Sequence, residues 1–370
     1  MAIEDQITLI EEEIKKTQYN KATSHHIGKL KAKLAKLREE REKRASAGGG
    51  GGQGYSVRKS GHASVSLVGF PSVGKSTMLS KMTDAESEVG AYEFTTLTCI
   101  PGMMEHKHAE IQVLDLPGLI KGAAFGKGRG REVIAVARSS DLVLLVADAL
   151  NPEQVMTIVD ELYAAGIRLN QRPADIKIFR SRDRGGITVS FTVKQSHLSE
   201  DLVKDMLKEY GIVNADVVIR DDATVDQLVD AITGNRVFLK SLIAINKIDR
   251  QDPDFVKEAM ARFEARGWPT VPIAASIDFN LEKLKDVVYD TLGFISVYLK
   301  PQGKDADMDE PLVVKGGSTI GDVCDGLHRD FRRKFRYALV TGPSAKFDNQ
   351  NCGIDHVLKD GDVLTIVTIR

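Results

Sequence analysis

Gly69-Phe-Pro-Ser-Val-Gly-Lys-Ser76-Thr77 matches the phosphate-loop pattern G-x-x-x-x-G-K-[ST]. The apolar run 63–68 before it predicts a buried strand, and residues 76–82 after it predict a helix. Gly69 and Gly74 let the backbone turn tightly, so that successive N–H groups and the positive end of the helix can face phosphate oxygens. This strand, loop and helix predict a nucleotide site in an α/β fold.

Two side chains of this loop carry its chemistry. Lys75 supplies positive charge to the β- and γ-phosphates, and we expect it to act in catalysis. Ser76 carries the hydroxyl that such loops place on Mg²⁺, a hard cation that keeps several waters and needs only one or two protein oxygens. The predicted nucleotide contacts of the loop are Gly69, Phe70, Pro71, Ser72, Val73, Gly74, Lys75, Ser76 and Thr77.

A second motif, Asp115-Leu-Pro-Gly118, follows the alternating stretch 111–114. It places a carboxylate at the carboxyl end of a strand, where Asp115 can hold the water shell of Mg²⁺ while the Gly118 N–H reaches the γ-phosphate. We therefore expect Asp115 to bind the metal through water and Gly118 to act in catalysis. Leu116, Pro117 and Leu119 are expected beside the nucleotide.

The third motif, Asn246-Lys-Ile-Asp249, ends the apolar strand 242–245 and predicts the base. Asp249 can accept both N1–H and the N2 amino group of guanine, whereas adenine would leave this carboxylate unpaired. We expect Asn246 to contact the purine and the stem of Lys247 to lie along its face. A backbone N–H of the later loop would meet guanine O6, and the loop residues are Ala274, Ala275 and Ser276. The predicted ligands are GTP and GDP.

A threonine-rich segment without helical periodicity, Tyr92-Glu-Phe-Thr-Thr-Leu-Thr98, lies between the first two motifs. We interpret it as a switch loop, in which a threonine hydroxyl completes the Mg²⁺ shell only while the γ-phosphate is present. Thr96 is the expected metal ligand and catalytic residue, with Thr95 a close alternative because sequence alone does not fix the register. Phe94 and Leu97 flank the two threonines as nucleotide contacts. Thr98 is better explained by an extended strand.

These motifs, with Gly128-Arg-Gly-Arg131, resemble the Obg-type GTPases, specifically the developmentally regulated GTP-binding proteins of archaea and eukaryotes. The stretches 20–25, 31–38 and 166–170 are particularly similar to that family, and the resemblance covers nearly the whole chain. It implies a cytoplasmic, Mg²⁺-dependent GTPase that works on or near ribosomes. Eukaryotic members pair with dedicated regulatory proteins, which makes such a protein a candidate partner here, although the resemblance leaves open whether this chain has one. The family pattern also supports Ser76 and Thr96 as Mg²⁺ ligands.

Leu119 stands where Ras-like GTPases carry the glutamine that orients the attacking water. Intrinsic hydrolysis is therefore expected to be slow, with the missing function supplied by a partner or by cations of a glycine-rich stretch, Lys121, Lys127, Arg129 and Arg131. That these cations are solvated or meet rRNA phosphates is an equal alternative. Some related GTPases use K⁺ with an asparagine ligand in the phosphate loop. That position is Ser72 here, which leaves K⁺ as a hypothesis.

The expected organisation is an α/β fold with four parts. Residues 1–47 form a helical hairpin, 48–60 a glycine-rich linker, 61–293 a P-loop GTPase domain with a mostly parallel sheet, and 294–370 a TGS domain of the β-grasp type. About a hundred residues separate the strand 141–147 from Asn246, too many for one crossover helix, so an α+β lobe is expected at about 168–225. In it we expect strands at 175–179 and 186–192 and a helix at 199–210.

Two cationic stretches suggest RNA contact. The second arm of the hairpin carries an excess of lysine and arginine over glutamate between residues 29 and 44, which suits phosphate backbones or, equally, a solvated amphipathic helix. The expected helix of the TGS domain, about 320–331, runs into His328-Arg-Asp-Phe-Arg-Arg-Lys-Phe-Arg-Tyr337, which can meet rRNA or tRNA. The alternative is a capped helix whose phenylalanines face the core.

Composition agrees with this organisation. The chain has 370 residues and a net charge of -1. This length suggests two or three domains, and 42% hydrophobic residues are enough for ordinary cores. Its cysteines, Cys99, Cys324 and Cys352, have no metal-ligand spacing, which suits a reducing cytosol. Because no long apolar run is present, membrane spanning and secretion are not expected, and neither is DNA binding.

Two functional classes are compatible with the sequence. The preferred one is an enzyme that serves as a GTP switch on ribosomes or in translation, stimulated by a partner. The alternative is an RNA- or ribosome-binding adaptor in which the nucleotide is mainly structural. Within the enzyme class, an Obg-like ATPase with a TGS domain is the competitor, and Asp249 argues against it.

Overall fold

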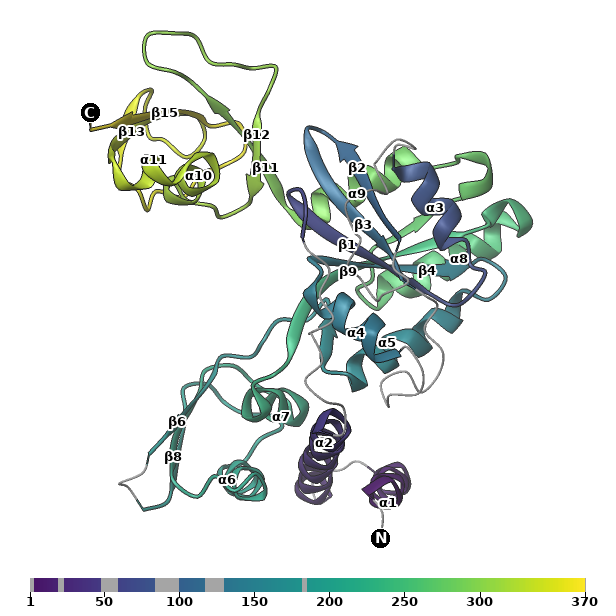
Figure 1. The fold of residues 1–370 in the computed structure, drawn as a ribbon. Helices are drawn as coiled ribbons and strands as arrows, with labels where there is room; N and C mark the ends of the chain where they lie inside the picture. The colour runs from purple at the N-terminus through teal and green to yellow at the C-terminus, as the bar shows by residue number, and fades with distance from the viewer. Residues whose placement is uncertain are drawn as a thin grey trace. The chain divides into compact units, whose positions relative to one another are not determined.

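The computed structural model describes residues 3–18, 23–47, 59–83, 100–116, 130–181 and 185–369. The chain groups into two compact units (Figure 1). One consists of residues 1–54 with 166–238, and the other of residues 55–165 with 239–370. Among the described residues, no helix has the length and apolar character needed to cross a membrane.

The larger unit is built on a sheet with the strand order β10-β9-β4-β1-β3-β2. All neighbouring pairs in this order are parallel except β2 with β3, which are antiparallel. β1 and most of β4 are buried along their length, as expected for central strands covered on both faces. The strands are β1 (Ala63–Gly69), β2 (Ile100–His106), β3 (Ala109–Asp115), β4 (Leu142–Asp148), β9 (Val237–Asn246) and β10 (Thr270–Pro272).

Helices cover both faces of this sheet (Figure 1). α3 and α9 bury Met78 and Leu284 in one apolar cluster with Leu67 of β1. α4 and α5 lie on the other face. The helices are α3 (Lys75–Met82), α4 (Gly130–Ser139), α5 (Val155–Ala164), α8 (Pro253–Ala265) and α9 (Leu281–Leu292), with short 3-10 turns at η3 (Pro152–Gln154), η4 (Ile248–Arg250) and η5 (Ala275–Ile277). The parallel arrangement brings the ends of β1, β3, β4 and β9 to one edge, where the sequence motifs lie.

The C-terminal part forms a second sheet, ordered β12-β11-β15-β13-β14, around its own apolar core. The single helix expected at about 320–331 is two helices, because His328 is extended and its Nδ1 accepts the Asp330 N–H as the cap of the second. The elements are β11 (Phe294–Leu299), β12 (Leu312–Lys315), α10 (Ile320–Leu327), α11 (Arg329–Arg333), β13 (Phe335–Thr341), β14 (Gln350–Cys352) and β15 (Val363–Thr368).

Asp141 connects this second sheet to the first. Its carboxylate accepts bonds from Lys315 Nζ at the end of β12 (2.6 Å) and from the N–H and hydroxyl of Ser64 in β1 (2.9 and 3.0 Å). Lys59 adds a longer contact at 3.2 Å. Burial alone would raise the pKa of Asp141, but the hydrogen bonds from Lys315 and Ser64 outweigh it and lower the pKa to about 2.

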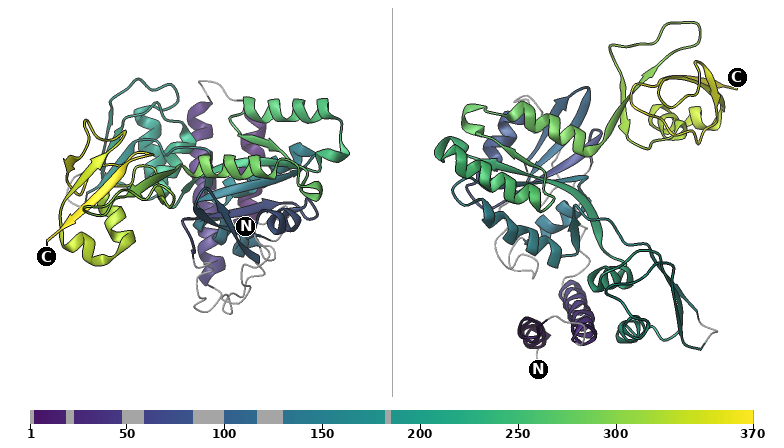
Figure 2. Two further views of the ribbon diagram at one scale, coloured as in Figure 1. Left: turned by 90° about the horizontal axis from the view of Figure 1, so that it is seen from above. Right: turned by 180° about the vertical axis from the view of Figure 1, so that it is seen from behind.

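The smaller unit combines two distant segments of the chain, and in Figures 1 and 2 its first two helices lie side by side. Its three-stranded sheet has the order β6-β8-β7, so the two strands predicted from the sequence do not pair with each other but lie on either side of β8. Residues 182–184 between them lie outside the described ranges. The elements are α1 (Ile3–Lys16), α2 (Ser24–Ala47), β5 (Ile167–Leu169), β6 (Ile176–Arg180), β7 (Ile187–Phe191), α6 (Glu200–Glu209), β8 (Ala215–Ile219) and α7 (Val225–Thr233).

The basic arm of the hairpin, α2, packs on the lobe. Ala32 is fully buried in the lobe's apolar core, and a Cβ at Gly28 would lie only 2.8 Å from Leu202 of α6. Lys29 pairs with Asp205 at 2.6 Å. At least one of the lysines that the sequence analysis considered as contacts for RNA phosphates is thus paired with a carboxylate within the protein.

Two further lysines of α2 contact the lobe. Lys31 pairs with Asp226 at 2.7 Å, and Lys36 donates to the carbonyl of Glu209 at 2.6 Å. The hairpin is therefore part of the lobe and not a free arm. Of the predicted linker 48–60, residues 48–58 lie outside the described ranges.

Removing the Asp141 charge should destabilise the larger unit in a pH-dependent way. We expect Asp141→Asn to lower the free energy of unfolding by about 2 kcal/mol at pH 7, because a shift of one pKa unit corresponds to about 1.4 kcal/mol. The folded pKa is depressed, so this stabilisation is present above about pH 5 and is lost as the pH falls through 3.8 toward 2.

The measurement is urea unfolding of both proteins between pH 7 and pH 3. The difference in unfolding free energy should shrink by about half between pH 5 and pH 3. Asp254→Asn is the matched control, because that carboxylate is 88% exposed. A difference in unfolding free energy that does not change with pH would contradict the lowered pKa of Asp141.

Enlarging Ala32 should loosen the lobe. We expect Ala32→Leu to cost about 1–3 kcal/mol, since extra methylene groups in a filled core force neighbouring side chains to move. Hydrogen exchange should rise in α6 and α7 as well as in α2. The control is Lys33→Leu, at an exposed position of the same helix. Unchanged protection of α6 and α7 would show that α2 does not belong to their folding unit.

Candidate functional site

The phosphate loop turns between β1 and α3 in a strained backbone. Ser72 and Gly74 have positive φ angles of 63° and 97°. At Gly74 space is also limiting, because a Cβ would come within 2.3 Å of Asn246 Nδ2. Glycine is thus required here both for its conformation and for the close approach of the base-recognition loop.

Lys75, the first residue of α3, is buried and points back across the loop. Its Nζ donates to the carbonyl oxygens of Gly69 at 3.1 Å and Phe70 at 3.0 Å. Burial lowers the pKa of Lys75, and the nearby Asp115 acts in the opposite direction. The ammonium group is therefore held by neutral oxygens, and anionic phosphate oxygens would hold it more strongly.

Ser76 and Asp115 bring two hard oxygen donors together. The Ser76 hydroxyl donates to Asp115 Oδ2 at 2.5 Å. The other carboxylate oxygen, Oδ1, is buried and has no hydrogen-bond partner among the described residues. A buried carboxylate oxygen without a partner is unfavourable unless a cation or its water meets it. The pair fits Mg²⁺, and the roles of Ser76 as direct ligand and of Asp115 as a ligand through water remain predictions.

Asn246, at the end of β9, joins three loops. Its Nδ2 donates to the Val73 carbonyl of the phosphate loop at 2.9 Å. Its Oδ1 accepts the N–H groups of Lys247 at 2.8 Å and Ala275 at 3.0 Å. The Ala275 N–H belongs to the loop from which we expected one backbone N–H to meet guanine O6, and here it is bonded to Asn246. Its role toward the base remains a prediction.

Lys247 and Asp249 lie on the same turn. Lys247 adopts a left-handed conformation with φ 66°, and its Nζ donates to the Ser72 carbonyl at 2.7 Å. The side chain thus spans from the base motif to the phosphate loop. The Asp249 carboxylate is 27% exposed, with Arg250 at 3.8 Å, so it is open to a ligand. Ala274 and Ala275 are buried, whereas Ser276 is exposed.

Asp148 is a site residue that the sequence reasoning missed. It ends β4 directly beside Asn246 in the β4–β9 register, and its Oδ2 accepts from Lys247 Nζ at 2.7 Å. Its Oδ1 also accepts the Leu150 N–H at 3.0 Å. A carboxylate directly after the apolar run 142–147 is the same signal that identified Asp115. That signal could have found it.

Several predicted site residues lie outside the described ranges. These are the switch residues Phe94, Thr95, Thr96 and Leu97, the motif residues Pro117, Gly118 and Leu119, and the cations Lys121, Lys127 and Arg129. Arg131 is placed only as part of α4, and its side chain is not described. Leu116 is fully buried, with its N–H directed at the Leu67 carbonyl.

The fold and the site define a P-loop GTPase. Residues 64–180 match the family described as 50S ribosome-binding GTPase, 184–294 match the C-terminal region of the MMR_HSR1 domain, and 295–368 match the TGS domain. The predicted fold class is thereby confirmed.

Relatives similar to the whole chain narrow the class. An uncharacterized GTP-binding protein of Methanocaldococcus jannaschii is 54% identical and spans 100% of this chain and 94% of its own length. The developmentally-regulated G-protein 1 of Arabidopsis thaliana is 46% identical, covering 99% of this chain and 92% of its own. A Dictyostelium discoideum homologue of developmentally-regulated GTP-binding protein 1 is also 46% identical, covering 99% of this chain and 100% of its own length. The chain belongs to the developmentally regulated GTP-binding protein family, and it is a GTP-binding GTPase.

Asp148 should matter for nucleotide affinity more than for turnover. Asp148→Ala removes a charge-assisted hydrogen bond from Lys247, and we expect the Kd for GDP to rise about five- to tenfold while kcat changes less than twofold. Calorimetric titration with GDP and Mg²⁺ measures this effect. Glu153→Ala is the matched control, because it removes partly exposed ion pairs with Arg262 and Arg266. An equal loss of affinity in both variants would remove Asp148 from the site.

Proposed function

We propose that this GTPase is a switch that acts on ribosomes, with slow intrinsic hydrolysis that a partner stimulates. In the GTP form, Thr96 and Gly118 contact the γ-phosphate side of the site, and hydrolysis releases them. The ribosome, through rRNA or tRNA, and a dedicated regulatory protein are the proposed partners. A cytoplasmic location follows from this role.

The chain's own groups supply most of the proposed chemistry. Lys75 exchanges the carbonyls of Gly69 and Phe70 for β- and γ-phosphate oxygens and stabilises the charge that develops during transfer. Mg²⁺, when bound, neutralises phosphate charge and polarises the γ-phosphoryl group. Ser76 and Asp115 are the residues that would hold it. Asn246 and Lys247 fix the loop around the base and phosphates.

The water-positioning step is where a partner is needed. Leu119 has no polar group that can orient water, so phosphate clamping alone would sustain only slow turnover. Within the site, the cations of the stretch 121–131 or a bound K⁺ are proposed to supply the missing water-positioning or charge-stabilising group. From outside, a side chain of the partner would supply it. Equal rates in Na⁺ and K⁺ buffers would remove the K⁺ proposal.

The observation that supports RNA contact is the end of α11 with the start of β13. Phe331, Arg333, Lys334 and Arg336 are each exposed within six residues of the chain, while Phe335 packs on the domain core. Asp330 pairs with Arg333 at 3.2 Å, so part of this charge is already compensated. An exposed aromatic ring among cations can stack on a base and meet phosphates at once. We call Phe331, Arg333, Lys334 and Arg336 the basic TGS face.

Reversing charge on the basic TGS face should weaken ribosome binding. We expect Lys334→Glu with Arg336→Glu to reduce affinity for ribosomes at least tenfold, with a weaker salt dependence, because each lost phosphate contact lowers the salt slope. Sedimentation with purified ribosomes at several salt concentrations measures both the affinity and its salt dependence. Lys304→Glu with Lys359→Glu is the control, with the same charge change at exposed positions of the same domain.

Multiple-turnover assays separate the switch from the adaptor. A switch predicts faster GTP hydrolysis with ribosomes or the partner, and tighter ribosome binding with a non-hydrolysable GTP analogue than with GDP. An adaptor predicts no change in rate and equal affinity in both nucleotide states. The second result would overturn the proposal while leaving the GTPase assignment intact.

A further inference from the structure

Residues 274–279, between β10 and α9, form a loop that we call the base loop. Its larger side chains anchor it little, because Ile277 and Phe279 are 64% and 49% exposed. The small side chains of Ala274 and Ala275 are buried. Ala274 and Phe279 exchange two backbone hydrogen bonds, at 3.1 and 3.2 Å, which close the loop on itself. The position of the base loop relative to the sheet therefore depends on the hydrogen bonds at its two ends.

Asn280 connects these two ends. It directly precedes α9 and has a left-handed backbone with φ 61°. An asparagine at the start of a helix commonly accepts an N–H of the first turn, but the side chain of Asn280 makes no such capping bond. Its Nδ2 instead donates to the carbonyl of Pro272, the last residue of β10, at 2.9 Å. The amide thus joins the strand before the base loop to the helix after it.

The strand end of this connection is fixed to β9. The Ile273 N–H donates to the Ile245 carbonyl at 2.8 Å, and the Ala275 N–H donates to Asn246 Oδ1 at 3.0 Å. Asn280 therefore relates the far end of the base loop to the strand that carries the base motif.

An ion pair also reaches the base loop, but it holds the loop weakly. Lys81 of α3 lies 2.9 Å from Asp278, and the two side chains are 43% and 59% exposed. An ion pair in such an exposed setting contributes little to stability. The partly buried bond from Asn280 to Pro272 is the stronger restraint on this side of the loop.

The direction of the backbone N–H groups in the base loop matters for the choice of base. Guanine offers an acceptor at O6, whereas adenine carries an amino donor at the same place. An N–H that is held in one direction bonds to the first and is left unpaired against the second, which is how a polar site rejects the wrong ligand. Hydrogen bonds weaken steeply when the angle at the donor is poor, and a loop that must first be ordered loses affinity.

We propose that Asn280 is a positioning residue for guanine selection. Its bond to Pro272 holds the base loop so that a backbone N–H of residues 274–276 faces O6 of the base. Asn280 itself touches no ligand. This inference rests on the O6 contact expected of the base loop, and it is independent of the ribosome role.

Three nucleotides separate positioning from a general loss of structure. Inosine diphosphate keeps O6 and lacks the 2-amino group of GDP, whereas 6-thioguanosine diphosphate keeps the amino group and replaces O6 by sulfur, a weaker acceptor. Asn280→Gly removes the amide and tolerates the positive φ. Calorimetric titration of the full chain with Mg²⁺ should show the Kd for GDP and for inosine diphosphate rising about five- to tenfold. The Kd for 6-thioguanosine diphosphate should rise less than twofold.

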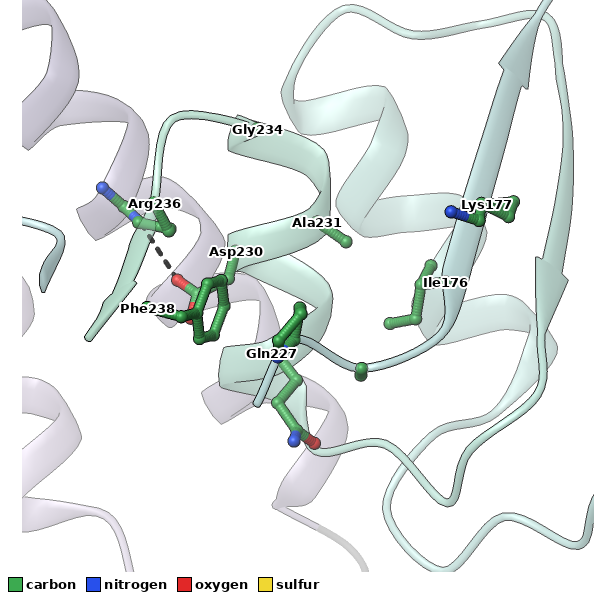
Figure 3. A pocket seen from close by; sticks show the side chains of 10 residues that line it. Ile176, Lys177, Gln227, Asp230, Ala231, Gly234, Arg236 and Phe238 are labelled. Atoms are coloured by element: carbon green, nitrogen blue, oxygen red, sulfur yellow. Dashed lines mark hydrogen bonds and ion pairs between the residues drawn. The ribbon is translucent and has the colours of Figure 1, made fainter. Parts of the chain in front are cut away.

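Further variants test the bond itself. Asn280→Asp keeps the size of the side chain, but its carboxylate cannot donate to Pro272, so it should lose the same preference for GDP over the sulfur analogue. Asn349→Gly is the matched control, because Asn349 is an exposed asparagine with φ 54° in the TGS domain. Gln227→Ala is the second control. Gln227, drawn in Figure 3, accepts the Thr224 N–H at 2.8 Å at the start of α7 in the smaller unit. Both controls should bind all three nucleotides like the parent.

Thermal unfolding verifies that each variant is folded, and kcat for GTP should change less than twofold because the phosphate side of the site is untouched. An equal rise in Kd for all three nucleotides, an unchanged preference in Asn280→Gly, or the same loss in a control would each overturn the proposal. If the parent chain binds GDP and 6-thioguanosine diphosphate equally, the expected O6 contact is wrong and the inference is overturned with it. The ribosome experiments do not depend on any of these outcomes.

Discussion

The side chain of Asn246 is the interaction on which the nucleotide site depends. It bonds to the carbonyl of Val73 and to the N–H of Ala275, so one amide fixes the phosphate loop and the base loop relative to β9. Gly74 must be glycine for this approach to occur. Lys247 and Asp148 add a charged connection parallel to it. The site is therefore preorganised as one network, which reduces the ordering cost of binding.

Much of this site was predictable because its signals are local. Lys75 and Ser76 follow directly from the loop spacing, and Asp115 and Asn246 each end a strand that the apolar pattern reveals. Parallel pairing then brings the strand ends together. The partner of the Ala275 N–H was not predictable, because two adjacent N–H groups in a loop give the same sequence signal.

Long-range packing was the least predictable part. Lys31 and Asp226 are 195 residues apart in sequence, and nothing in the composition of either helix identifies the other as its partner. The basic arm therefore had two equally good interpretations. The break at His328 was missed for a different reason, because its extended backbone and Nδ1 cap depend on the turn that follows α10. The strand β8 was not among the expected elements of the lobe, so the sequence analysis could not give the order β6-β8-β7.

The lobe's two-segment construction has a consequence for synthesis on the ribosome. Ala32 leaves the ribosome about 170 residues before Leu202, and at roughly 5–20 residues per second this is a delay on the order of 10–30 s. During that interval the face of α2 that later packs on α6 and α7 has no partner, while the phosphate loop and the first strands of the larger unit's sheet are synthesised. A nascent chain of this kind needs shielding from aggregation until the second segment arrives.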